Sequence, residues 1–479
     1  MNNPKINNLE RSIFSGIQWN LILSSGGQIV NVGFTLLLSR LLDPGDFGLL
    51  AVATAIIGLI GAFGPLGSVA ALTQRRVMSD QFYSAVVVVV AITSCIILVV
   101  LACSASLLTS FYGLPDLKLI FLLLLIPVPF QAIEILPFAE LQRQLAFEKI
   151  ALYSFISVVV SGLISIYLAY TGEGWIALVV RIVVLQIVRT LLFCTSAWPS
   201  FMFKPRKREI RELLRYGLPQ SVTEFLSLFG RRIDDILIGK WMGAGPLGVY
   251  SLAYNLYLWP ISNIKGRISQ VLFAALSKVQ SDHAAMGSYY LKTVSLATLI
   301  GFPVIMGFGA ICDLAVPVVM GEKWNMAIPV LRTLALASIF EIGVFPGAIY
   351  QAIGHTKSFL KIIFVTRLIA TLGIIMALFF GFGLQGVSMS LVVTSFISLI
   401  IYNFYVGKII KVTPWAFVQA MVHNGFFSVI MLLMIIGFRY FFGDYFAPLS
   451  RLILSILIGG VGYLLLMKRY RPYIFKLTN

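Results

Sequence analysis

The sequence predicts an all-α integral membrane protein with about fourteen transmembrane helices. The 479 residues are 59% hydrophobic and only 11% charged, and the mean hydropathy of +0.94 is too high for an ordinary water-soluble globule. Apolar segments of about 20 residues, the length that crosses a bilayer core, recur along the whole chain. These segments are continuous, whereas the strands of a membrane barrel would alternate over about 10 residues, so the spans are predicted to be helices.

The predicted spans follow one another with short connections. No small-residue cleavage site follows the first apolar segment, so this segment is predicted to remain as an uncleaved span. In chain order the spans cover residues 14–39, 47–70, 83–109, 117–139, 150–170, 175–197, 216–239, 246–270, 289–314, 326–350, 359–381, 384–406, 415–441 and 449–468.

Basic residues are distributed unevenly between the two sides of these spans. With a cytoplasmic N-terminus, 24 Lys and Arg residues fall on the cytoplasmic side and 6 on the other, so both termini are predicted to be cytoplasmic. These loops account for most of the formal charge of +17, and no nucleic-acid partner is expected. The four Cys and three His residues show no metal-binding spacing, so we expect no metal and no cofactor.

The most basic connection, FKPRKREIRELLRYG, covers residues 203–217. Two interpretations stay open, namely an interfacial helix held by anionic lipid head groups and a docking site for a partner. The connection also divides twelve spans into two sets of six. We therefore predict an N-terminal six-helix lobe over 1–200, a basic cytoplasmic connection over 201–215, a C-terminal six-helix lobe over 216–408, and two additional helices with a cytoplasmic tail over 409–479.

An internal repeat supports the division into two lobes. LLSRLLDPGDFGLLAVA, which begins at Leu37, aligns with LIGKWMGAGPLGVYSLA, which begins at Leu237, so that Gly48 matches Gly248 at an offset of 200 residues. Because each half contains six spans, both halves begin on the cytoplasmic side and the repeats are parallel. Two six-helix lobes around a central cavity are therefore expected.

A stripe of polar residues runs along the seventh predicted span at steps of three or four residues. Its members are Gln220, Glu224, Ser227, Arg231 and Asp235. The matching residues of the first span are uncharged: Asn20, Ser24, Gly27, Asn31 and Thr35. Since a polar face in a membrane helix avoids lipid, both stripes are expected to line one water-filled cleft.

Four charged residues stand close together in RRIDD, residues 231–235. Each costs roughly 2.5 to 3.5 kcal/mol near the bilayer centre unless it has a partner or water. Helical spacing lets Arg231 reach Asp234 or Asp235, and lets Arg232 reach Asp235. A self-neutralised structural cluster and a substrate or ion contact therefore both stay open.

The candidate substrate-binding residues are mainly arginines within spans, because a guanidinium binds phosphate oxygens at two points. They are Arg181, Arg189, Arg231, Arg232, Arg332 and Arg367, together with Asn31. Each arginine is equally suited to an interhelical ion pair. Acidic residues that can bind a cation near these arginines are candidates for ion coupling: Glu224, Asp234, Asp235 and Glu341. The excess of Arg over acids favours an anionic, phosphate-bearing cargo.

Several segments together resemble polysaccharide flippases of the MOP exporter superfamily, in particular the Wzx-like branch that exports colanic acid or lipopolysaccharide. Besides the two repeat copies, these segments are AELQRQLAFEKIALY, FKPRKREIRELLRYGLP, ALSKVQSD, VMGEKWNMAIPVLRTLA and AIGHTK. Arg231, Asp234, Gly239, Gly248 and Tyr250 match the family pattern. Arg232 adds a charge to that pattern, and Asp235 replaces its usual amide.

The resemblance implies a transporter, and not an enzyme, in the bacterial inner membrane. Its cargo would be an undecaprenyl-diphosphate-linked oligosaccharide that is moved to the outer leaflet for assembly of O-antigen, capsule or exopolysaccharide. The resemblance also implies alternating access driven by H⁺ or Na⁺, with polysaccharide polymerase machinery as a partner. Two alternatives stay open: a multidrug or cation antiporter, and a membrane glycan polymerase or ligase.

Overall fold

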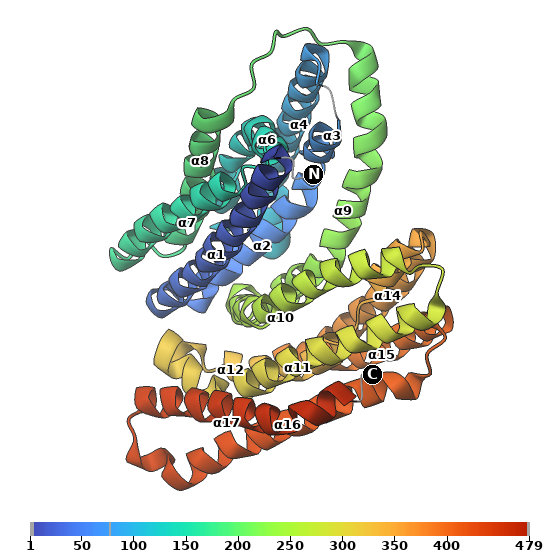
Figure 1. Cartoon of the computed structure of the whole chain (residues 1–479). Helices are drawn as coiled ribbons and strands as arrows, with labels where there is room; N and C mark the ends of the chain where they lie inside the picture. The colour runs from blue at the N-terminus through green and yellow to red at the C-terminus, as the bar shows by residue number, and fades with distance from the viewer. Residues whose placement is uncertain (1–3, 76–77, 477–479) are drawn as a thin grey trace. The chain divides into compact units, whose positions relative to one another are not determined.

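The computed structural model describes the backbone of residues 4–75 and 78–476, and the side chains of residues 23–468 except residues 74, 76, 77, 356, 357 and 444. All regular structure in these residues is helical (Figure 1). The chain forms two compact units, Met1–Gly248 and Val249–Asn479. The all-α fold predicted from composition and apolar periodicity is therefore confirmed.

The helices of the first unit are α1 (Pro4–Leu41), α2 (Pro44–Gly61), α3 (Ser68–Gln74), α4 (Asp80–Tyr112), α5 (Leu117–Leu123), α6 (Pro127–Arg143), α7 (Phe147–Tyr170), α8 (Trp175–Ala197), α9 (Lys207–Met242) and the start of α10 (Ala244–Lys278). Helix α7 packs on α1 and α8, while α9 packs on α2, α3 and α4 (Figure 1). Small residues allow close approach, since a Cβ added to Gly162 in α7 would lie 2.3 Å from the Phe34 ring of α1.

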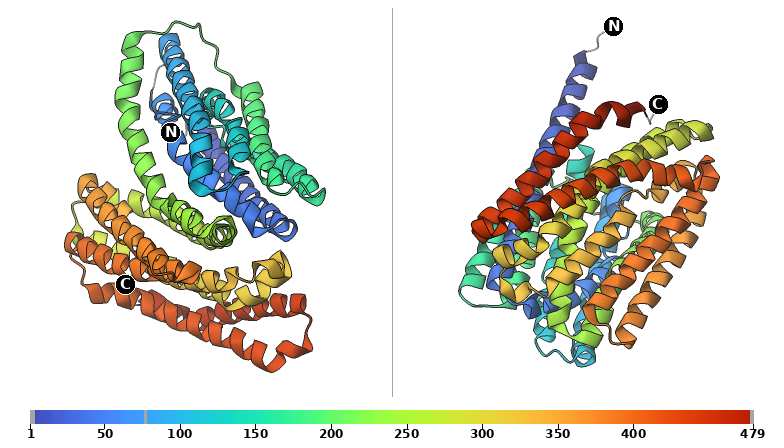
Figure 2. Two further views of the ribbon diagram at one scale, coloured as in Figure 1. Left: turned by 180° about the vertical axis from the view of Figure 1, so that it is seen from behind. Right: turned by 90° about the horizontal axis from the view of Figure 1, so that it is seen from below.

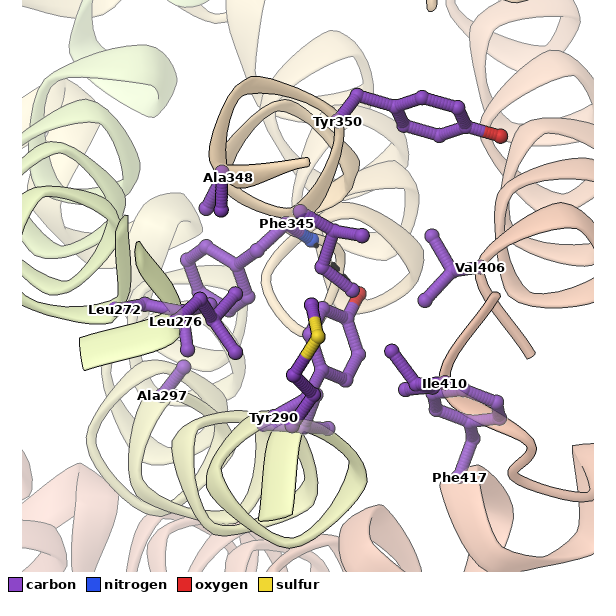
Figure 3. Packing of buried hydrophobic residues seen from close by; sticks show 14 of the residues in the cluster. Leu272, Leu276, Tyr290, Ala297, Phe345, Ala348, Tyr350, Val406, Ile410 and Phe417 are labelled. Atoms are coloured by element: carbon purple, nitrogen blue, oxygen red, sulfur yellow. Dashed lines mark hydrogen bonds between the residues drawn. The ribbon is translucent and has the colours of Figure 1, made fainter. Parts of the chain in front are cut away.

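The second unit holds the rest of α10 and a series of further helices. They are α11 (His283–Ala315), η1 (Val316–Met320), η2 (Glu322–Trp324), α12 (Ala327–Glu341), α13 (Pro346–Ala352), α14 (Thr356–Phe379), α15 (Gly383–Ile410), α16 (Pro414–Phe442), η3 (Gly443–Tyr445) and α17 (Pro448–Lys476). Helices α16 and α17 run side by side (Figure 2). In the core of this unit, the Tyr290 hydroxyl accepts the backbone N–H of Phe345 at 3.1 Å (Figure 3).

Eleven helical segments in the described part of the chain are long and apolar enough to cross a membrane. They coincide in order with eleven of the predicted spans. The other predicted spans, 14–39, 216–239 and 246–270, fall on α1, α9 and α10. The chain is thus a multi-pass membrane protein, and the count of fourteen stays a prediction.

The boundary between the two units lies after α9, because α9 packs on the helices of the first unit. The predicted lobes instead begin a new half at residue 216, on the basis of the repeat. Their bounds stay a prediction.

The basic connection is partly helical, since residues 207–215 form the first turns of α9. Arg75 holds this end of α9 by ion pairs to Glu209 and Glu212 at 3.0 and 2.9 Å.

The two copies of the repeat meet within the first unit, where α2 and α10 begin. A Cβ added to Gly48 would lie 1.8 Å from the carbonyl oxygen of Ala244, and one added to Gly248 would lie 1.7 Å from that of Pro44. Positions 44 and 244, like 48 and 248, are related by the offset of the repeat. The contact is therefore reciprocal, and glycine at both positions permits an approach that a side chain would block.

Candidate functional site

Helix α9 carries the polar stripe predicted from the sequence. Both ends of this helix pack closely against other segments of the first unit. Near its start, a Cβ added to Gly217 would lie 1.8 Å from the carbonyl oxygen of Leu66. Near its end, a Cβ added to Gly239 would lie 2.9 Å from the Val52 side chain. Between these contacts, the side chains of α9 face a cavity, to which Gln220, Ser221, Glu224 and Leu228 contribute.

This cavity of the first unit has a volume of about 840 Å³. Its other walls come from α2, α3, α4, α6 and the connection between α2 and α3. Most of the described lining residues are apolar, and the polar ones are Thr73, Ser94, Gln131, Gln142, Gln220, Ser221 and Glu224. The volume lies within the range of about 300 to 1,000 Å³ that is common for small-molecule pockets.

The charged part of the stripe forms ion pairs along α9. Arg231 Nη2 lies 3.9 Å from Glu224 Oε1, and both side chains are about half exposed. Arg232 Nη1 donates to Asp235 Oδ2 at 3.0 Å, as helical spacing predicted. Asp234 and Asp235 are buried. The Arg231–Glu224 pair extends the charged cluster about three turns back from Asp234 and Asp235, to the wall of the cavity.

Two predicted substrate-binding residues meet between α1 and α8. Arg181 Nη2 donates to Asn31 Oδ1 at 2.7 Å and to the Asn31 carbonyl oxygen at 3.0 Å, while Nη1 donates to Thr35 Oγ1 at 3.1 Å. Asn31 and Thr35 are neighbours on the stripe predicted for the first span; the side chain of Asn20 lies outside the described residues. These hydrogen bonds orient the guanidinium of Arg181 without neutralising it, because the groups that accept them are uncharged.

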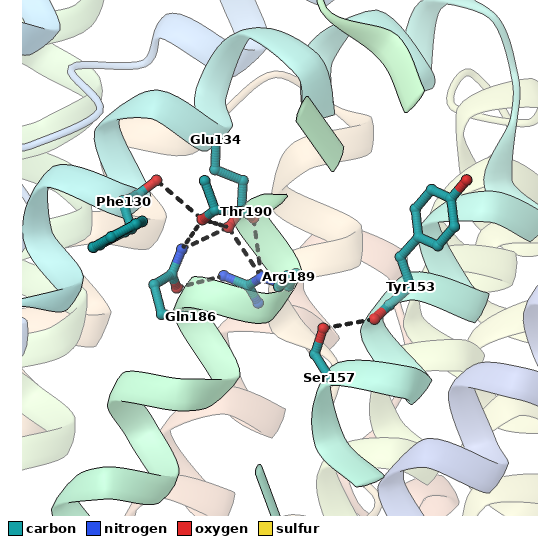
Figure 4. Close-up of polar contacts among 7 residues, drawn as sticks. All are labelled: Phe130, Glu134, Tyr153, Ser157, Gln186, Arg189 and Thr190. Carbon is teal, nitrogen blue, oxygen red and sulfur yellow. Dashed lines mark hydrogen bonds and ion pairs between the residues drawn. The ribbon is translucent and has the colours of Figure 1, made fainter. Parts of the chain in front are cut away.

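Arg189 lies in a network between α6 and α8 (Figure 4). Its Nε lies 3.0 and 3.1 Å from the two carboxylate oxygens of Glu134. Gln186 donates to Glu134 at 2.6 Å and accepts from Arg189 at 2.9 Å, while the Thr190 hydroxyl donates to Glu134 at 3.3 Å. This geometry corresponds to the interhelical ion pair that the sequence left open as an alternative to substrate contact.

Arg332 belongs to an ion cluster in the second unit. Asp313 Oδ2 lies 3.2 Å from Arg332 Nη2 and 2.6 Å from Arg439 Nη2, and Asp313 Oδ1 accepts from Arg439 Nη1 at 3.0 Å. The cluster joins α11, α12 and α16. Sequence reasoning missed Asp313, although an acid inside the predicted span 289–314 was a usable signal.

Glu341 and Arg367 line one pocket of about 230 Å³ in the second unit. Glu341 Oε1 accepts from Ser395 Oγ at 2.9 Å, and Oε2 lies 3.5 Å from the Tyr257 hydroxyl. Lys265, from α10, also lines this pocket, and its Nζ donates to the backbone carbonyl oxygen of Glu341 at 2.8 Å. The structure thus brings together one ion-coupling candidate, one substrate candidate and a lysine that the sequence did not single out.

Lys265 is one of the 24 basic residues predicted on the cytoplasmic side, because it lies near the end of the predicted span 246–270. Helix α10 continues beyond that span to Lys278, so Lys265 lies well before the end of the helix. Among the described residues, no three His, Cys, Asp or Glu side chains gather as they would around a metal ion.

A family profile described as "Polysaccharide biosynthesis protein" matches residues 37–329. Relatives include the teichuronic acid biosynthesis protein TuaB of Bacillus subtilis (strain 168), which is 25% identical over 358 residues, 72% of this chain and 72% of TuaB. The lipopolysaccharide biosynthesis protein WzxC of Escherichia coli (strain K12) is 25% identical over 346 residues, 70% of this chain and 68% of WzxC.

Two solved structures share the fold. The lipid II flippase MurJ in an inward closed conformation has a TM-score of 0.74 and 17% identity, over 95% of this chain and 99% of MurJ. A multidrug resistance MATE family transporter of the MOP superfamily has a TM-score of 0.62 and 15% identity, over 80% of this chain and 94% of the transporter. At these identities the likeness concerns the fold alone.

Proposed function

Because the chain belongs to the polysaccharide biosynthesis protein family, we propose that it translocates an undecaprenyl-diphosphate-linked oligosaccharide across a bacterial cytoplasmic membrane. The chain is a membrane transporter of the MOP type and not an enzyme. In this proposal both termini are cytoplasmic, and the cargo moves from the inner to the outer leaflet. There it enters the assembly of a surface polysaccharide through a polymerase.

The observation that carries the proposal is the environment of Arg181. Its guanidinium is fixed by Asn31 and Thr35, and these partners leave its charge in place. A charge within membrane helices is costly and is retained where it has a function. A diphosphate is the complementary ligand, since a guanidinium can bind two of its oxygens at once.

The cavity of the first unit offers groups that suit a sugar. Its amide side chains, Gln131, Gln142 and Gln220, both donate and accept hydrogen bonds, as sugar hydroxyls require. The apolar remainder of the lining suits the faces of sugar rings. This combination supports an uncharged or weakly charged oligosaccharide next to a strongly anionic linkage.

Ion coupling is proposed to act through Glu224. Its carboxylate pairs with Arg231 at 3.9 Å and lines the cavity, so it competes with an anionic cargo for the same guanidinium. Binding of a cation or proton to Glu224 would release Arg231 to the cargo. In this proposal Arg231 exchanges the Glu224 carboxylate for the anionic cargo, and this exchange drives alternating access.

The test is translocation of a fluorescent undecaprenyl-diphosphate-linked oligosaccharide in proteoliposomes that contain the purified protein. We expect Arg181→Met to lower the rate by about 10- to 150-fold, since a charge-assisted hydrogen bond contributes about 1.5 to 3 kcal/mol. Arg181→Lys should retain part of the rate, and Lys118→Met, at an exposed position in α5, should retain all of it. Unchanged translocation by Arg181→Met at equal protein levels would refute the role of this arginine.

The same preparation distinguishes the alternatives. An antiporter of drugs would move a cationic dye and leave the lipid-linked oligosaccharide in place. A glycan polymerase or ligase would change the covalent length of the oligosaccharide, which gel analysis of the recovered lipid would detect.

A further inference from the structure

The pocket of the second unit is built around a break in a membrane helix. Helix α12 ends at Glu341 and α13 begins at Pro346, within one candidate span. Carbonyl groups at the end of a helix lack helical partners and carry a partial negative charge. The carbonyl oxygen of Glu341 accepts the N–H of Val344 at 3.2 Å and the ammonium of Lys265 at 2.8 Å. Lys265 therefore compensates the end of α12.

The break is anchored in the hydrophobic core. Phe345 donates its backbone N–H to the Tyr290 hydroxyl (Figure 3). The Phe345 ring centroid lies 5.9 Å from Lys265 Nζ. Both Phe345 and Tyr290 are buried. The packing of α11 and α13 thus holds Phe345, at the α13 side of the break, in position.

The oxygen atoms around the Glu341 end of α12 are of the kinds that bind a hard cation. The end of α12 supplies a backbone carbonyl, Glu341 supplies a carboxylate, and Tyr257 and Ser395 supply hydroxyls. Hard cations select carboxylate, carbonyl and hydroxyl oxygens. In this chain the ammonium of Lys265 contacts the backbone carbonyl oxygen of this set.

The fixed charges of the pocket disfavour a second cation. Lys265 from α10 and Arg367 from α14 face one carboxylate, Glu341 from α12. The other titratable lining groups are the phenols of Tyr254, Tyr257 and Tyr402. An alkali cation that entered would meet two positive charges and one negative charge.

We propose that Lys265 is a built-in cation that takes the place of Na⁺ in this pocket, so that the protein binds no Na⁺ there. The inference rests on the proposed ion-coupled transport and assigns Lys265 as the residue that excludes Na⁺ from this pocket. Removal of the ammonium exposes the oxygen set and creates a Na⁺ site.

The test measures Na⁺ binding to the purified full-length protein, independently of translocation. Melting temperatures are compared in NaCl and in choline chloride of equal ionic strength. The wild-type protein should show no Na⁺-specific shift. Lys265→Met, which keeps the length of the side chain, should gain a rise in Tm that saturates with Na⁺ concentration. Glu341→Gln added to Lys265→Met should abolish the rise, because a Na⁺ site requires the carboxylate.

For each variant, the melting temperature in NaCl is compared with that in choline chloride. This comparison separates Na⁺ binding from any change in basal stability. Lys278→Met, at an exposed position of the same helix, is the matched control and should show no Na⁺-specific shift. If Lys265→Met does not fold, direct binding of ²²Na⁺ to the wild-type protein decides the question. Saturable binding to the wild type that Glu341→Gln removes would overturn the proposal, as would a folded Lys265→Met variant without a Na⁺-specific shift.

Discussion

A methyl group added at Gly248 tests the contact between the two copies of the repeat. The added carbon would lie 1.7 Å from the carbonyl oxygen of Pro44 and 2.8 Å from the backbone nitrogen of Gly48. Both obstacles are backbone atoms at the start of α2, so a rotamer change cannot relieve the clash. The start of α10 must move away from α2.

The size of this displacement follows from the distances. Real Cβ contacts do not fall below 3.0 Å, so the two backbones must separate by at least about 1.3 Å, the difference between 3.0 and 1.7 Å. Overpacking costs about 1 to 3 kcal/mol. The lower unfolded-state entropy of Ala recovers about 0.4 to 1 kcal/mol. We therefore expect a net loss of about 1 to 2 kcal/mol for Gly248→Ala, and a similar loss for Gly48→Ala.

The repeat itself supplies matched controls. Gly45 and Gly245 lie three residues before the contact glycines, and a Cβ at either would meet no atom within 4 Å. Gly45→Ala and Gly245→Ala should therefore leave stability unchanged or raise it slightly. Thermal unfolding of the purified proteins, followed by size-exclusion fluorescence, compares the four variants. Equal melting temperatures for Gly248→Ala and Gly245→Ala would refute the close backbone contact.

Two ion clusters allow further predictions. Arg189→Leu should destabilise the protein by about 3 kcal/mol, because the buried carboxylate of Glu134 then lacks its cationic partner. The double variant Arg189→Leu with Glu134→Leu should recover much of this loss. Thermal unfolding of the two single variants and the double variant measures both effects. Arg439→Leu should lower the melting temperature more than Arg332→Leu, since Arg439 makes two bonds to Asp313 and is 23% exposed against 53%. A larger loss for Arg332→Leu would contradict this geometry.

The membrane helices were predictable because the properties that make a segment span a membrane are contained in the segment itself. A helix that crosses lipid must satisfy its own backbone and be apolar over about 20 residues. Eleven predicted spans meet this condition in the structure. The family was predictable for a related reason, since the repeat and its glycines form continuous motifs, and the matched region 37–329 contains both copies.

The partners of the charged residues were predictable only where they are local. Arg232 and Asp235 are three residues apart on one helix, so spacing alone gave their pair. Arg189 and Glu134 are 55 residues apart, and their pairing depends on how α6 packs on α8. Lys265 illustrates the same limit. It lies near the end of a predicted span, and the sequence does not distinguish a lysine at a cytoplasmic loop from one that lines a pocket.

The composition of α9 has a consequence for how the chain enters the membrane during synthesis. Twelve of its 36 residues are charged, and Asp234 and Asp235 become buried among protein. A segment with such charges partitions poorly into lipid by itself. Its packing partners α2, α3 and α4 all precede it in the chain. They are in place before α9 leaves the ribosome, so the order of synthesis provides the surface on which this helix becomes stable in the bilayer.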